Sequence, residues 1–113
     1  MIAMEKYKKI IEAFRRKATE ILPSGSRVAL YGSRARGDAR DDSDWDLHIL
    51  VPGGERLSLS EEDRLCNPFS DIGLFEFEEI VNPRAYTYSG WEKRSFLPFY
   101  KNVEKDKIVI FQN

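Results

Sequence analysis

Apolar residues recur in the first third of this chain at two different spacings, and each spacing predicts a different element. Over residues 4–22 they follow at intervals of three and four, with lysine and arginine between them, which predicts one amphipathic helix. Pro23 and Gly25 should end this helix. Residues 27–31 form a short, mostly apolar run, which predicts a strand covered on both faces.

Residues 45–51 alternate between apolar and polar positions, as a half-buried strand does. The apolar face consists of Trp45, Leu47, Ile49 and Val51. The opposite face carries Asp44, Asp46, His48 and Leu50. We expect the first set to lie in the core. His48 lies beyond the two aspartates on its face, so we expect it beneath a helix and away from the mouth of the strand.

Two overlapping capping-box patterns predict where a second long helix begins. They pair Ser58 with Glu61 and Ser60 with Asp63. We expect the helix to run from about residue 60 into the region of residue 66. Pro68 should then bend it or end its first part, because proline lacks the backbone N–H that a helix interior needs.

Three further elements follow in the last third of the chain. Residues 78–88 predict a third strand, and Pro83 inside it favours an edge position or a bulge. Residues 89–96 predict a short helix, and residues 107–111 predict a last strand. The order helix, strand, strand, helix, strand, helix, strand predicts an α/β (α+β) fold, with a small mixed sheet flanked by helices.

Composition limits the class of protein. With 113 residues, 42% of them hydrophobic and 33% charged, we expect a soluble globular chain that forms a single domain over residues 1–113. The net charge of −1 gives no global electrostatic reason to bind nucleic acid or anionic lipid. No segment has the pattern of a signal peptide or approaches the roughly 18 apolar residues of a membrane span. The single cysteine, Cys66, fits a reducing compartment, so we expect a cytoplasmic protein.

Two carboxylates stand where a charged loop leads into the buried second strand. Asp44 and Asp46 are two residues apart, so their side chains project to the same side. Like charges held this close raise each other's pKa, and a divalent cation relieves the repulsion. Mg²⁺ prefers such hard oxygen ligands and is typically completed by substrate phosphates. The pair therefore predicts a magnesium site for a phosphorylated substrate.

A turn that suits phosphates precedes the aspartates. Gly32 lets the backbone approach a ligand closely, Ser33 adds a hydroxyl, and a helix starting there aims free N–H groups at an anion. Arg36, one helical step from Ser33, is the basic residue we expect to contact phosphate; Arg34 and Arg40 are alternatives. An Asp-x-Asp pair alone is common in solvated turns, and arginines often serve only solubility. The combination at this spacing favours a site for a metal-bound triphosphate.

The stretches "GSRARG" and "SDWDL", within residues 28–51, resemble the signature of the DNA polymerase β-like nucleotidyltransferase superfamily. The short chain resembles its minimal nucleotidyltransferase branch. The resemblance implies that Gly32 and Ser33 contact the β- and γ-phosphates of ATP or another nucleoside triphosphate. It implies that Asp44 and Asp46 ligate one or two Mg²⁺ ions in a transfer of a nucleoside monophosphate, AMP from ATP.

The family also has a third carboxylate on a neighbouring strand. Glu79, at the start of "EIV", fits this catalytic position best; Glu76 and Glu78 are alternatives, and none is the usual aspartate. If no acid occupies the position, the resemblance implies a catalytically weak nucleotide-binding antitoxin or regulatory subunit.

Minimal members of the family are often paired with a helical HEPN-domain protein, a ribonuclease toxin that they neutralise by AMPylation. The resemblance therefore implies a protein partner of this kind, with the chain itself as the antitoxin; a homo-oligomer is an alternative assembly. A nucleic-acid-binding module is a third interpretation, which the net charge disfavours. The aromatic residues Trp91, Phe96, Phe99 and Tyr100 predict a core cluster or a partner surface.

Overall fold

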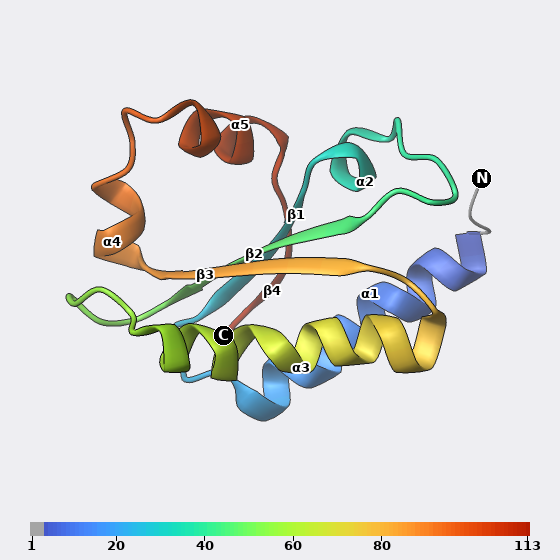
Figure 1. Ribbon diagram of the computed structural model, residues 1–113, viewed down its shortest axis with the longest axis horizontal. Coiled ribbons are helices and arrows are strands. Elements are labelled where there is room, and N and C mark those ends of the chain that lie inside the picture. The colour runs from blue at the N-terminus through green and yellow to red at the C-terminus, as the bar shows by residue number, and fades with distance from the viewer. Residues whose placement is uncertain (1–3) are drawn as a thin grey trace.

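A four-stranded sheet in the order β3-β2-β1-β4 runs through the centre of the molecule (Figure 1). The computed structural model describes residues 4–113. Its elements are α1 (Met4–Ile21), β1 (Arg27–Tyr31), α2 (Ser33–Arg36), β2 (Trp45–Val51), α3 (Leu59–Phe77), β3 (Val81–Thr87), α4 (Tyr88–Glu92), α5 (Pro98–Asp106) and β4 (Ile108–Gln112). Within residues 4–113, no helix combines the length and the apolar character needed to cross a bilayer.

The sheet is mixed, as expected for this fold class. The central strand β1 pairs antiparallel with β2 on one side and with β4 on the other. Strand β3 runs parallel to β2 and forms the opposite edge of the sheet, joined to it by the crossover helix α3. The predictions of a mixed sheet with flanking helices and of Pro83 on an edge strand are therefore confirmed.

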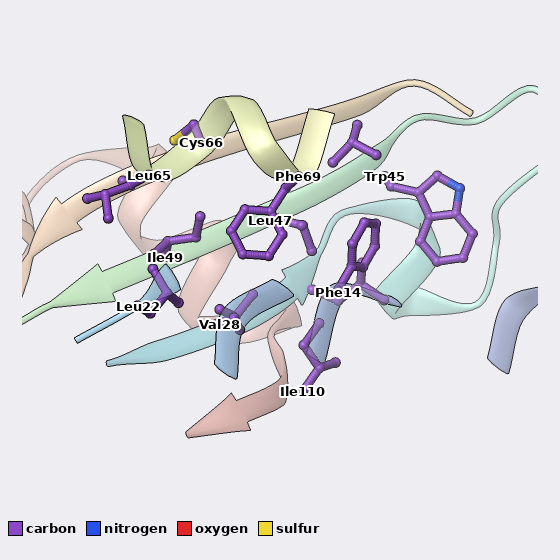
Figure 2. Close-up of a cluster of buried hydrophobic side chains, with 14 of the residues drawn as sticks. Phe14, Leu22, Val28, Trp45, Leu47, Ile49, Leu65, Cys66, Phe69 and Ile110 are labelled. Atoms are coloured by element: carbon purple, nitrogen blue, oxygen red, sulfur yellow. The ribbon is translucent and has the colours of Figure 1, made fainter. Parts of the chain in front are cut away.

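One face of the sheet is covered by α1 and α3, and the main core lies there. Phe14 of α1, Phe69 of α3, and Trp45 and Leu47 of β2 are fully buried against one another. Figure 2 shows these side chains filling the space between the sheet and the two helices. Burying each side chain of this size contributes about 1.5–3 kcal/mol, so this layer fixes the strand alternation that the sequence predicts.

The other face is only partly covered, by α4 and α5 (Figure 1). Leu50, Trp91 and Val103 form a second, smaller buried cluster there. His48 is fully buried beneath α4, with its ring centroid 4.1 Å from that of Trp91, which confirms its expected position away from the mouth of the strand. The end of this face where Asp46 lies stays partly open.

Helix α3 is longer than the sequence predicts. Ser58 forms the N-cap, and its capping box with Glu61 is present on both sides. Pro68 does not end the helix, one of the two outcomes expected for it, because α3 continues through it to Phe77. Proline removes one helical hydrogen bond, but Phe69 and the rest of the buried face of α3 hold the helix against the sheet.

The segment after α3 also departs from the expected pattern. Glu78 adopts a left-handed conformation with φ of 55°, which ends the helix and delays β3 until Val81. The short helix expected at residues 89–96 is α4, which begins one residue earlier and ends at Glu92. Helix α5 was not predicted at all, although Pro98 at its first turn is a common helix start.

Candidate active site

The start of β2 lies between the end of β1 and the start of β3. Asp46 is in register with Tyr31 of β1 on one side and with Asn82 of β3 on the other. The Nδ2 of Asn82 donates to Asp44 Oδ2 at 2.8 Å and to Asp46 Oδ1 at 3.4 Å. The structure therefore brings both predicted aspartates to one point, held by an amide from the neighbouring strand.

The turn after β1 faces the same point. Gly32 has φ of 73°, a conformation in which other residues are strained. A Cβ at Gly32 would lie 2.5 Å from Asp46 Oδ2, so a side chain there would displace the carboxylate. The backbone of the turn thus packs directly against one of the two acids, which is the juxtaposition expected from the sequence.

Helix α2 opens toward the turn. The carbonyl of Gly32 accepts hydrogen bonds from the N–H groups of Ala35 (3.1 Å) and Arg36 (3.0 Å). The N–H groups of Ser33 and Arg34 precede these donors and therefore lie at the end of the helix that has no intrahelical acceptors. Together with the Ser33 hydroxyl, they are donors of the kind that bind phosphate oxygens.

The charges at this point are poorly compensated. Burial raises the pKa of Asp46, and the nearby Asp44 charge raises it further, while the hydrogen bond from Asn82 and the charge of Arg36 oppose the shift. Burial and the charge of Asp46 together raise the pKa of the Tyr31 hydroxyl to about 12, so it stays protonated. A bound cation would relieve the repulsion that raises the pKa of Asp46.

The donors at this point fit Mg²⁺. Among the described residues, no group of three or more histidine, cysteine or acidic side chains is placed to hold a metal ion, so the protein carboxylates available to a cation here are Asp44 and Asp46. Two carboxylates leave further positions for water and phosphate oxygens, which is how Mg²⁺ is usually bound.

Glu79 does not lie beside Asp44 and Asp46, so its position differs from the one expected of the third carboxylate. Its carboxylate accepts a hydrogen bond from Trp45 Nε1 at 2.8 Å and pairs with Lys6 Nζ at 3.2 Å. Trp45 alternates with Asp44 and Asp46 along β2, so its neighbours lie on the helix-covered face of the sheet. The alternatives fail in the same way: Glu76 pairs with Arg16 of α1, and Glu78 lies at the end of α3 near α1.

Arg34 belongs to this same structural group. Its side chain is 2% exposed, and its guanidinium stacks on Trp45 at 4.6 Å from the ring centroid. It donates to the carbonyl of Ser43 at 2.8 Å and lies 3.5 Å from Glu79 Oε1. The guanidinium therefore fixes the loop before β2 and does not face the aspartates.

Asn82 is a residue of the candidate site that was not predicted from the sequence. It lies on the neighbouring strand β3, in register with Asp46 and on the same face. The alternation of residues 81–87, with Asn82, Arg84 and Tyr86 opposite Val81, Ala85 and Thr87, contained the signal. Because the candidates for the third position were all acidic residues, an asparagine was not among them.

A cavity of about 380 Å³ adjoins the Gly32 turn on the β1 side. It lies between the turn and α5, which contributes Asn102, Lys105 and Asp106 to its wall. Arg36 also lines it, and its guanidinium donates to Asp106 Oδ2 at 2.9 Å and to Asp38 Oδ2 at 3.2 Å. Arg36, the residue expected to contact phosphate, therefore lies beside the turn, and in this structure it is paired with two carboxylates.

The remaining residues singled out from the sequence have structural surroundings. Burial lowers the pKa of His48 to about 3 and raises that of the Cys66 thiol to about 12, so both side chains are neutral near pH 7. Trp91 and its aromatic neighbours form the second core cluster, whereas Phe96 is 72% exposed and lies outside it.

Residues 7–111 match the nucleotidyltransferase domain family. The chain belongs to this family. The nucleotidyltransferase is 35% identical over 78 residues to a protein of Methanocaldococcus jannaschii assigned as protein adenylyltransferase MJ0141; the match covers 68% of this chain and 76% of that protein. Family membership makes the chain an enzyme of the transferase class and confirms the resemblance seen in its motifs.

Solved structures share the fold of the nucleotidyltransferase. A protein from Sulfolobus solfataricus assigned as a nucleotidyltransferase matches with a TM-score of 0.65 and 19% identity, over 97% of this chain and 86% of that one. A chain of a toxin–antitoxin structure with AMP-PNP matches with a TM-score of 0.58 and 14% identity, over 99% and 75%. A chain of a mutant toxin–antitoxin MntA-HpeT matches with a TM-score of 0.57 and 12% identity, over 99% and 75%. At these identities the likeness is one of fold.

Proposed function

We propose that this nucleotidyltransferase transfers AMP from ATP to a hydroxyl group of a protein in a reaction that depends on Mg²⁺. The observation that carries the proposal is the meeting of Asp44, Asp46 and the Gly32 turn at one end of the sheet. Paired carboxylates beside free backbone amides suit a metal-bound triphosphate. The likeness to a protein assigned as a protein adenylyltransferase supports AMP as the transferred group and a protein as the acceptor.

Each residue of the site has a role in this proposal. Asp44 and Asp46 would hold one or two Mg²⁺ ions, which neutralise charge on the phosphates and polarise the α-phosphate. The backbone at Gly32 and the hydroxyl of Ser33 bind the β- and γ-phosphates. Arg36 exchanges its bond with Asp106 for a phosphate oxygen, since both partners lie in the same cavity wall.

The transfer is a single displacement at the α-phosphorus. The acceptor oxygen bonds to this atom, the bond to the oxygen that bridges the α- and β-phosphates breaks, and pyrophosphate leaves. The acceptor proton passes to solvent, because in the described residues no third carboxylate faces Asp44 and Asp46.

Asn82 favours a second candidate. An amide in place of the third carboxylate supplies no negative charge, which supports a subunit that binds nucleotide and metal and turns over slowly or not at all. Such a chain would act as an antitoxin by binding alone.

A protein partner is part of the proposal. The fold shared with chains of toxin–antitoxin structures supports a partner protein, and we propose a helical HEPN-domain toxin encoded beside this gene as the acceptor. The buried free thiol of Cys66 agrees with action in the reducing cytoplasm.

The test uses ATP radiolabelled at the α-phosphate, Mg²⁺ and the HEPN-domain partner. We expect label on the partner with the wild-type chain, and none when EDTA replaces Mg²⁺ or when the chain carries Asp44→Asn. Arg64→Asn, an exposed substitution on α3, is the matched control and should leave labelling unchanged.

The outcomes separate the candidates. Binding of Mg²⁺ and ATP without label on the partner supports the binding-only subunit. Strong salt-sensitive binding of RNA that survives Asp44→Asn would instead support a nucleic-acid-binding module.

A further inference from the structure

A second cavity, of about 450 Å³, lies along the outer edge of β3 near its end. Arg56, Arg84 and Arg94 line it, together with Glu62 as the acid among the described lining residues. These residues give the cavity an excess of two positive charges in a chain whose net charge is −1. None of these residues takes part in the proposed nucleotide site, so that site does not explain this concentration of positive charge.

Two of the three arginines, Arg84 and Arg94, are held in place around Tyr86. The guanidinium carbon of Arg94 lies 5.0 Å from the Tyr86 ring centroid, and that of Arg84 lies 5.9 Å from it. Arg94 also donates to the carbonyl of Gly90 at 2.8 Å, and Arg84 lies 3.7 Å from Glu62. Each guanidinium has five N–H donors, so these contacts fix the positions of the groups and leave donors for an anion.

The cavity and the aspartates are connected by one strand. Asn82, Arg84 and Tyr86 alternate along β3 and share the face on which Asp46 lies. At about 3.3 Å per residue, Tyr86 lies about 13 Å from Asn82 along the strand. Arg84 lies halfway between them. A chain laid along β3 in an extended conformation would span this distance with four residues.

The direction of the reaction places the acceptor on this side. The Gly32 turn and the cavity beside it lie on the β1 side of Asp46, and the proposed function puts the leaving pyrophosphate there. The attacking and leaving oxygens of a phosphoryl transfer lie roughly in line. The acceptor hydroxyl therefore approaches from the opposite side of Asp46, which is β3.

We propose that this arginine-lined cavity binds an acidic segment of the protein acceptor. This proposal rests on the proposed function. Aspartate or glutamate side chains of the acceptor dock against Arg56, Arg84 and Arg94, about four residues from the hydroxyl that receives AMP. A protein fits better than RNA, because the net charge of −1 gives no global electrostatic reason to bind a long phosphate backbone.

The test compares two synthetic peptides of equal length. One carries a tyrosine followed by two glycines and four alternating glutamates and aspartates; in the other, these acids are replaced by glutamine and asparagine. Binding is measured by fluorescence anisotropy without ATP. We expect the acidic peptide to bind about tenfold more tightly at low salt, and expect the difference to shrink as salt rises.

Charge reversal locates the interaction. The double variant Arg56→Glu with Arg84→Glu should abolish the preference for the acidic peptide, and Arg56→Lys with Arg84→Lys should keep most of it. Arg64→Glu on the exposed side of α3 is the control and should leave the preference unchanged. Circular dichroism melting checks that the variants fold.

Several results would overturn the inference: equal binding of both peptides, an equal effect of Arg64→Glu, or tighter binding of a single-stranded RNA of the same length. The proposed function fails separately. A chain that prefers the acidic peptide but transfers no label from ATP to any partner keeps the docking site and loses the transferase mechanism. A chain that labels its partner but shows no preference for acidic peptides keeps the transferase mechanism and loses the docking site.

Discussion

Two groups of carboxylates flank Trp45 on opposite faces of the sheet, and their surroundings differ. Glu79 is 11% exposed, and its oxygens meet the indole N–H of Trp45 and the cations of Lys6 and Arg34. In the part of the chain that the structure describes, the pair Asp44 and Asp46 shares the amide of Asn82. The first group is satisfied by fixed protein donors, and the second leaves negative charge for a ligand to compensate.

The cations and donors around a carboxylate distinguish a structural acid from a candidate metal ligand better than the position of the residue in the sequence does. A buried carboxylate with its own cations resists loss of either partner, because the remaining charge would be left unpaired. The two carboxylates of a pair without bound cations repel each other, and a bound metal would relieve this repulsion. Substitutions on the two sides of Trp45 should therefore affect different properties.

Asp46→Asn should have the largest effect. It removes one of the two proposed ligands, so we expect transfer of label to fall at least about 100-fold and Mg²⁺ binding to become undetectable by calorimetry. Because burial raises the pKa of Asp46, its charged form is unfavourable in the folded chain, and the neutral amide should not lower the melting temperature. A variant that melts early would show that Asp46 is a structural acid after all.

Glu79→Gln should lower the stability of the fold and leave the binding of Mg²⁺ unchanged. The free energy of unfolding should fall by about 2 kcal/mol in urea titrations, because Lys6 and the buried Arg34 lose their counter-charge. Affinity for Mg²⁺ should stay the same. Cys66, whose thiol is buried, provides a second readout, since its modification by a thiol reagent should speed up as the fold opens more often.

Glu76→Gln is the matched control for this prediction. Its contact with Arg16 is exposed on both sides and 3.9 Å long, so the free energy of unfolding should change by less than about 0.5 kcal/mol. A loss of Mg²⁺ affinity in Glu79→Gln would contradict the division between the two groups.

Asn82→Asp sharpens the comparison by making the functional group more acidic. A third carboxylate beside Asp44 and Asp46 should raise the affinity for Mg²⁺ about tenfold and lower the melting temperature of the metal-free chain, because like charges repel. Calorimetry and melting curves with and without Mg²⁺ measure both effects. Unchanged affinity would mean that the Asn82 side chain does not face the bound cation.

Lys105→Ala should have the smallest effect. Lys105 lines the cavity beside the Gly32 turn, and loss of one exposed cation should weaken ATP binding about threefold without changing stability. Lys101→Ala, exposed on the same helix and outside that cavity, is the control for the helix itself. Equal effects of the two substitutions would remove Lys105 from the nucleotide site.

The elements nearest the motifs could be predicted from sequence because local pattern and tertiary packing agree there. The apolar positions 45, 47, 49 and 51 are buried in β2 as predicted, although His48 and Leu50 on the other face are buried too. The spacing of residues 4–22 matches α1. Asp44, Asp46 and the Gly32 turn could be placed together because strand geometry alone fixes their direction.

The third ligand position and α5 could not be predicted in this way. The left-handed conformation of Glu78 shifts the start of β3 by three residues from the expected residue 78, and glutamate gives no local signal for it. In the sequence of α5, Phe99 and Tyr100 indicate an aromatic cluster rather than a helix. The buried residue of α5 is Val103. Burial against the sheet, rather than local spacing, determines this helix.

The absent side chain of Gly32 has a consequence for how such an enzyme can change. Since any larger residue would collide with the Asp46 carboxylate, the turn proposed to receive the pyrophosphate end and the residue proposed to bind the metal can only vary together. On the proposed function, new nucleotide preferences would arise in the cavity wall formed by α5, and new protein targets along the edge of β3. Specificity can diverge on both flanks while the chemical centre stays fixed.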